Sequence, residues 1–173
     1  NQAAAQADPT NASPINFTVV FSKPVTGFTN ADVLLSGTAG ATTAVVTGAG
    51  ANYNVAVSGM VGNGTVIATI PAGVAQDASS TTNTASTSTD NTVTYDNVVP
   101  TVIINQAALQ VDPTNVGPIN FTVVFSEPVI GFTGADVALS GTAGATTAVV
   151  TGTGTTYNVA VSGMAGSGTV TVG

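Results

Sequence analysis

The 173-residue chain contains no cysteine, histidine or tryptophan. Without thiols and imidazoles it lacks disulfides, thiolate nucleophiles, the commonest general base and the usual zinc ligands. One basic residue, Lys23, stands against eight acidic ones, so the chain cannot neutralise a phosphate backbone, and we exclude nucleic acid as a partner. Its apolar runs are far shorter than the roughly 20 residues that cross a bilayer, so we expect no transmembrane segment. Carboxylates without supporting donors do not make an active site, and we do not expect an enzyme.

The residues that are abundant favour strands and turns. Only 5% of the chain is charged, against about 25% in ordinary soluble domains. Threonine (30) and serine (12) together make almost a quarter of the residues, and the chain also has 20 glycines and 8 prolines. This composition is typical of β-structure joined by tight turns.

The sequence is an internal repeat with a period of 104 residues. When residues 1–69 are laid over residues 105–173 without a gap, 53 of the 69 positions are identical. An unchanged position is therefore weak evidence of function, whereas a changed one is informative. Lys23 corresponds to Glu127, so this position has no fixed electrostatic role.

Both ends of the sequence fall inside the repeat. Residues 101–104 (Thr-Val-Ile-Ile) precede the second Asn-Gln-Ala-Ala, and no counterpart precedes the first. The second copy stops within the segment that matches residues 64–70. We expect one domain at 1–99, whose first strand is missing or truncated, and a second at 100–173, truncated before its last strand. We also expect that the chain continues beyond both ends in a longer tandem array.

Alternating apolar residues predict about seven strands per repeat. The clearest is Ile15–Phe21, and glycine-rich turns separate the others. The predicted strands are 15–21, 32–36, 43–47, 53–58, 64–70, 92–95 and 101–104. Short, evenly spaced strands over about 100 residues predict an all-β fold of tandem immunoglobulin-like Greek-key β-sandwiches.

Several segments resemble bacterial Ig-like tandem repeats of very large secreted or surface-attached proteins. They are Asp-Pro-Thr-Asn at 112–115, residues 118–129, 131–137 and 157–164, and the junction 95–100. The resemblance covers nearly the whole chain and implies a place in adhesin stalks or repeating cell-surface fibres. Many members carry an Asp/Gly/Asn-rich loop after the sixth strand; here residues 75–80 contain one acidic residue, Asp77.

Two functions follow as hypotheses. The first is a structural repeat unit of a long extracellular filament or surface stalk. Its expected partners are neighbouring repeats of the same chain or identical chains in a fibre. The alternative is a multivalent adhesin repeat that binds a glycan or receptor through its loops, because loops on rigid scaffolds often carry recognition. Both place the protein outside the cell or on its surface.

Calcium is the one cofactor that the sequence suggests. Ca²⁺ takes six to eight oxygen ligands, and Asp96 and Asn97 at the junction could converge with Asp112 and Asn115 in an early loop of the next copy. The other interpretation is that Asp112 caps a turn and that Asp96 and Asn97 form a solvated linker.

Almost no charge protects the strand edges or covers the surface, so either covalent glycans or lateral packing of the edges against neighbouring chains must do so. We favour glycans on accessible side chains, because small hydroxylated side chains leave room for bulky adducts and contribute little hydrophobic area to a contact between chains. The N-linked candidates are Asn11, Asn16, Asn63 and Asn120, each in an Asn-x-Ser/Thr sequon. The O-linked candidates lie in a Ser/Thr-rich tract, which is equally compatible with a plain flexible loop. They are Thr81, Thr82, Thr84, Ser86, Thr87, Ser88 and Thr89.

Overall fold

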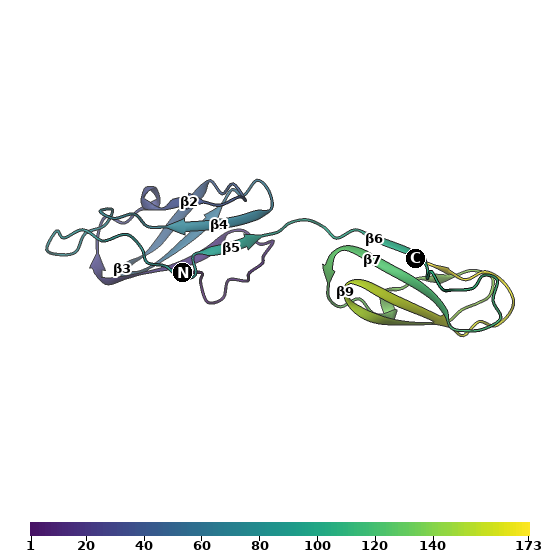
Figure 1. Ribbon diagram of the computed structural model, residues 1–173. Coiled ribbons are helices and arrows are strands. Elements are labelled where there is room, and N and C mark those ends of the chain that lie inside the picture. The colour runs from purple at the N-terminus through teal and green to yellow at the C-terminus, as the bar shows by residue number, and fades with distance from the viewer. The chain divides into compact units, whose positions relative to one another are not determined.

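The computed structural model describes all 173 residues and divides them into two compact units, Asn1–Val98 and Val99–Gly173 (Figure 1). The predicted boundary lies one residue later, between 99 and 100. Each unit is described by itself. Neither of the two helical segments, three residues each, is long enough to span a membrane.

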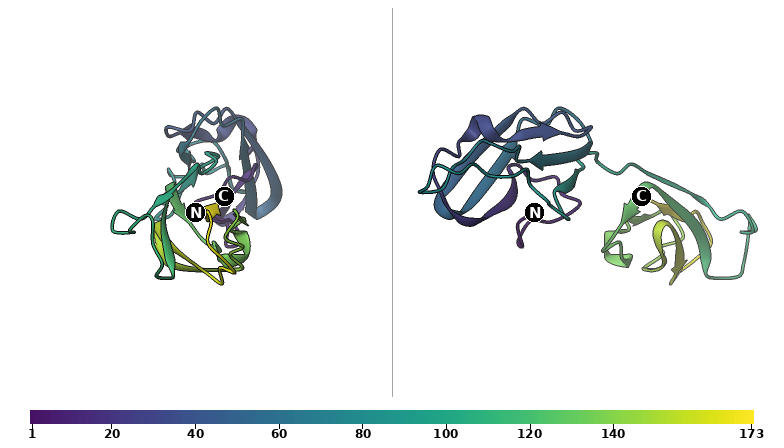
Figure 2. Two further views of the ribbon diagram at one scale, coloured as in Figure 1. Left: turned by 90° about the vertical axis from the view of Figure 1, so that its right-hand side faces the viewer. Right: turned by 60° about the vertical axis from the view of Figure 1, so that its left-hand side comes forward.

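The first unit consists of two antiparallel sheets. One pairs β1 with β3, and the other has the order β2-β4-β5. Figure 2 gives two further views of these strands. The elements are β1 (Ile15–Val25), the 3₁₀ turn η1 (Asn30–Asp32), β2 (Leu34–Ser36), β3 (Thr43–Ser58), β4 (Gly64–Thr69) and β5 (Thr92–Tyr95).

β3 folds back on itself as a hairpin. It is assigned as strand over 16 residues, yet the Thr42 N–H donates to the Ser58 carbonyl at 3.1 Å, so its two ends are neighbours. Close to the tip of the hairpin, Gly48 has a φ of +117° and lies so near Asn52 on the other arm that a Cβ would be 2.5 Å from the Asn52 carbonyl oxygen. Only glycine fits this position. The two predicted strands 43–47 and 53–58 are thus the two arms of β3.

Side chains from both sheets form one core in the first unit. Phe17 and Val55 from the β1–β3 sheet and Val66 and Val93 from the other sheet are buried in the same cluster. Burial alternates along β1 and along the second arm of β3, as a two-residue period requires. The alternation along the strands therefore places apolar side chains between two sheets that pack face to face.

Three aromatic rings close one end of this core. Phe21, Phe28 and Tyr53 meet edge to face, with ring centroids 5.1 to 5.8 Å apart. The Tyr53 hydroxyl donates to the carbonyl of Val25 at 3.0 Å, so the one polar atom of the cluster has a partner.

One strand begins later than the sequence predicts. The prediction started at Asp32, but β2 starts at Leu34 because the Asp32 carboxylate accepts hydrogen bonds from the N–H and hydroxyl of Thr29, both at 2.7 Å. These bonds hold η1 as a capped turn.

The second unit repeats this local structure. Its three-stranded sheet has the order β6-β7-β9, and β8 pairs with β10. Phe125, Phe132 and Tyr157 reproduce the aromatic cluster at 5.2 to 5.8 Å. The elements are β6 (Val102–Gln106), β7 (Ile119–Val129), η2 (Gly134–Asp136), β8 (Leu139–Ser140), β9 (Thr147–Ser162) and β10 (Thr171–Val172). The prediction of an all-β fold with antiparallel sheets is confirmed.

Candidate functional site: an exposed hydroxyl segment

The main concentration of candidate residues is the hydroxyl segment, which we define as residues 81–89 of the first unit. All seven of its predicted O-linked acceptors are exposed. Only one of their hydroxyl oxygens takes part in a hydrogen bond within the chain, that of Ser86, which accepts from the Ile70 N–H at 3.1 Å. The other six hydroxyls have no hydrogen-bond partner within the chain and belong to exposed residues, so a glycosyltransferase could reach them.

The backbone of the hydroxyl segment is nevertheless held against the domain. The amide oxygen of Asn83 accepts from the N–H groups of Val74 and Ala75, both at 2.9 Å, and its NH₂ group donates to the carbonyls of Pro71 and Thr84 at 2.8 Å. One half-buried side chain thus satisfies four backbone groups. Sequence analysis missed this residue, although an asparagine inside a Ser/Thr run is a visible signal for such an anchor.

The far end of the hydroxyl segment is fixed by the first residue of the chain. The Asn1 side-chain oxygen accepts from the N–H groups of Thr89 and Asp90 at 3.3 and 3.2 Å. The Asn91 amide donates to the Ala68 carbonyl at 3.1 Å. The segment therefore combines a positioned backbone with free hydroxyl groups.

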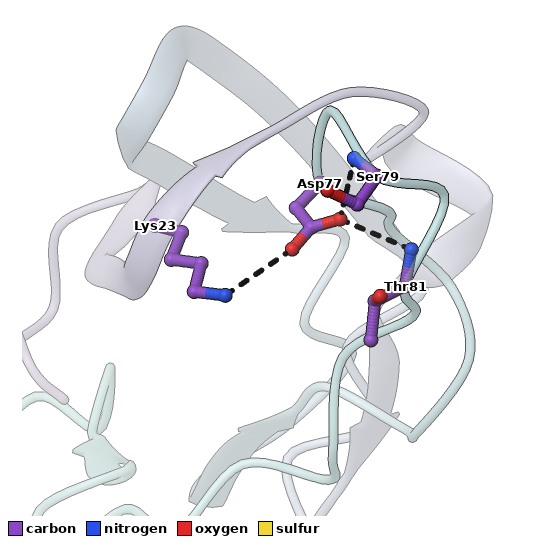
Figure 3. Close-up of polar contacts among 4 residues, drawn as sticks. All are labelled: Lys23, Asp77, Ser79 and Thr81. Atoms are coloured by element: carbon purple, nitrogen blue, oxygen red, sulfur yellow. Dashed lines mark hydrogen bonds and ion pairs between the residues drawn. The ribbon is translucent and has the colours of Figure 1, made fainter.

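A carboxylate organises the turn that leads into the hydroxyl segment (Figure 3). Asp77 accepts from the backbone N–H groups of Ser79 and Thr81 at 2.9 and 3.0 Å, and from the ammonium of Lys23 at 3.4 Å. The backbone bonds of Thr81 and then Ser79, with a smaller contribution from Lys23, hold the pKa of Asp77 below its ordinary value. All three donors bond to the Asp77 carboxylate, so this side chain fixes the backbone of the turn.

Lys23 and Asp77 form an ion pair within the first unit. The aligned residue of the second unit, Glu127, carries the opposite charge and therefore cannot form a pair of this kind with a carboxylate.

The junction residues Asp96 and Asn97 are engaged by a side chain of their own unit. The Asn63 amide donates to the Asp96 carboxylate at 2.5 Å, and its oxygen accepts from the Asn97 N–H at 2.9 Å. Asp112 and Asn115 belong to the second unit. No group of three or more acidic side chains that could hold a metal ion is present, and the calcium site stays a prediction.

The four sequons differ in their surroundings. Asn11 is exposed, and Asn63 is exposed but uses both ends of its amide on the junction. Asn16 and Asn120 are only half-buried rather than freely accessible, because each accepts a hydrogen bond from an asparagine of the neighbouring strand, Asn54 at 3.0 Å and Asn158 at 3.1 Å. Asn11 is thus the sequon with the most available amide.

Comparisons with known protein families, with curated proteins and with solved structures gave no match to this chain.

Proposed function

We propose that this chain is a structural repeat of a long extracellular filament or surface stalk, built from immunoglobulin-like Greek-key units and carrying O-linked sugars on the hydroxyl segment. The observation that carries the proposal is the duplication: two nearly identical sequences form two units, each with a hydrophobic core of its own. A unit that is copied and folds around its own core adds length to a chain without new chemistry.

The surface composition supports a sugar coat. Nine charged residues in 173 leave the strand edges with little of the protection that natural β-proteins usually carry. The exposed hydroxyls of the hydroxyl segment, on a backbone held by Asn83, offer closely spaced attachment points. Bulky hydrophilic adducts there would keep neighbouring chains apart.

The glycan part is tested by peptide mass spectrometry on native material. We expect hexose-containing adducts within residues 81–89, and their loss from a variant in which Thr81, Thr82, Thr84, Thr87, Ser88 and Thr89 are alanine. A matched control replaces six exposed threonines of other segments whose hydroxyls also make no hydrogen bond within the chain, namely Thr43, Thr47, Thr147, Thr151, Thr153 and Thr156. Native peptides that carry no adduct would refute glycosylation of this segment.

The filament part is tested by electron microscopy of chains that contain one to six periods joined in tandem. A spacer requires the contour length to rise by the same increment with each added period. The alternative, a multivalent adhesin, requires binding to a glycan array whose avidity rises with the number of periods. Such avidity in the recombinant chain, with no regular increment in length, would overturn the structural proposal.

A further inference from the structure

The segment that joins the two units is held at each end by the unit to which that end belongs. In the first unit the Asp96 N–H donates to the Thr10 carbonyl at 2.9 Å. In the second unit the Thr101 N–H donates to the Ser126 hydroxyl at 2.9 Å, and the Ser126 N–H donates to the Thr101 carbonyl at the same distance. The freedom of the junction is therefore confined to residues 97–100.

Asn63 shortens this free segment further. Its side-chain NH₂ group donates to the Asp96 carboxylate at 2.5 Å, and its side-chain oxygen accepts from the Asn97 N–H at 2.9 Å. The same carboxylate oxygen of Asp96 accepts from the Val98 N–H at 3.1 Å. One amide thus fixes a carboxylate and two successive backbone N–H groups, and it leaves only two junction residues without a hydrogen bond.

Those two residues, Val99 and Pro100, have little conformational freedom of their own. The proline ring fixes its own φ at about −65° and restricts the preceding residue to extended conformations. While the Asn63 bonds are in place, the junction is therefore a hinge of two restricted residues.

Asn63 lies on a turn that is itself fixed within the first unit. The Val61 N–H donates to the Ala39 carbonyl at 2.9 Å. Gly64 has a φ of +143°, and a Cβ on it would lie 2.1 Å from the Thr38 hydroxyl oxygen. The turn therefore packs too closely to shift, and it presents the Asn63 amide to the junction in one place.

The second unit has the same turn with a different side chain on it. The Ala165 N–H donates to the Ala143 carbonyl at 2.8 Å, as in the first unit. The residue aligned with Asn63 is Ser167. A serine hydroxyl is one oxygen on a shorter side chain, so it cannot occupy both places that the amide nitrogen and oxygen of Asn63 occupy.

We propose that Asn63 is a latch that sets the flexibility of the junction after its unit, and that serine at this turn position leaves such a junction unlatched. The end-to-end distance of a flexible chain grows with the square root of the number of free residues. Release of the latch raises that number from two (99–100) to four (97–100), which widens the range of the junction by about 1.4-fold. The latch acts on the junction whether or not the chain serves as a filament.

Spin labels in the two units measure this range. The chain has no cysteine of its own, so Thr47→Cys and Thr151→Cys place one label at equivalent exposed positions of each unit. Double electron–electron resonance then gives the distribution of distances between the labels. We expect Asn63→Ser to widen this distribution by about 1.4-fold. It should also speed amide exchange of Asn97 by about fivefold, because one hydrogen bond is lost.

Two further variants test whether the latch acts through Asp96. Asp96→Ala removes the acceptor of the Asn63 amide, so it should widen the distribution as Asn63→Ser does, and the double variant should add little to either. Full additivity would contradict a shared latch. The matched control is Asn52→Thr, which also replaces an exposed asparagine by the residue of the second copy, Thr156, and should change neither measurement.

Three other results would overturn the proposal. The first is an unchanged distribution in Asn63→Ser, with the protected amides of Val55 and Val57 showing that the first unit is folded. The second is widening of the same size in Asn52→Thr. The third is widening in the chain that retains Asn63 when a calcium chelator is added, because a metal ion would then hold the junction.

Discussion

Replacing Phe28 by leucine tests how much the aromatic cluster stabilises the first unit. Phe28 is 7% exposed, and its ring centroid lies 5.3 Å from that of Phe21 and 5.1 Å from that of Tyr53, both edge to face. Leucine keeps most of the apolar contact but loses both ring–ring interactions. Each is worth about 0.5–1.5 kcal/mol beyond area burial, so the free energy of unfolding should fall by about 1–3 kcal/mol.

Hydrogen exchange followed by mass spectrometry reports each unit separately. A loss of about 1–3 kcal/mol speeds exchange of the most protected amides by about 5-fold to 150-fold, since about 1.4 kcal/mol is a factor of ten. The effect should appear in peptides that contain Val55 and Val57, which are fully buried beside the cluster. Phe132→Leu should produce the matching loss in the second unit, where the centroid distances are 5.2 and 5.3 Å.

The control is Val45→Thr, because Val45 is 44% exposed and its replacement should change the free energy of unfolding by less than about 0.5 kcal/mol. The reasoning is refuted if Phe28→Leu changes exchange in the first unit by less than about twofold. It is equally refuted if peptides of the second unit respond as strongly, because the substitution would then act through something other than this cluster.

Three further changes have definite expected outcomes. Tyr53→Phe deletes one 3.0 Å hydrogen bond and should cost about 0.5–1.5 kcal/mol in chemical denaturation; no change would mean that the bond contributes nothing. Gly37→Ala should cost more than about 1 kcal/mol, because φ is +105° and a Cβ would lie 2.2 Å from the Thr65 carbonyl oxygen. Gly50→Ala has a φ of +69° but open space, so it should cost less, and equal losses would refute the clash. Hydrogen bonds lower the pKa of Asp77 in the folded state. The stability that the ionised Asp77 contributes is therefore complete above the ordinary pKa of an aspartate, and it is lost as the pH falls below about 4 and through the lowered pKa. NMR of the Asp77 carboxyl should give a titration midpoint below the ordinary pKa of an aspartate. A midpoint at or above that pKa would contradict the hydrogen bonds to Asp77.

The fold could be predicted because its signals are local. Alternation along residues 15–21 and 53–58 depends only on which side chains face the core, and the glycine turns between strands depend only on local backbone conformation. The start of β2 was placed two residues early, because the Asp32 carboxylate competes with the sheet by bonding to Thr29. A propensity pattern does not show such a side-chain bond.

The candidate site could be predicted only as a set of residues. Composition identified the hydroxyl segment, but its position depends on four bonds from Asn83 to backbone groups up to 12 residues away. The half-burial of Asn16 depends on Asn54 in the neighbouring strand, 38 residues later. The Asn16–Asn54 contact follows from strand register and the Asn83 contacts follow from the path of a loop, and alternation specifies neither. Accessibility could therefore not be derived from the sequence.

The distribution of differences between the copies bears on the two functional hypotheses. In the first unit, 12 of the 16 differing positions are exposed and only Ala68 is buried, so the core is retained while the surface varies. The exposed ones are residues 5, 7, 12, 13, 23, 26, 30, 34, 49, 52, 61 and 63. Most lie outside the strands or at the tip of the β3 hairpin, in the loops through which an adhesin repeat would bind. A multivalent binder needs the same loop surface in each copy, whereas a spacer needs only the same core. Variation at the loops over a core with a single difference therefore supports the proposed spacer rather than the adhesin.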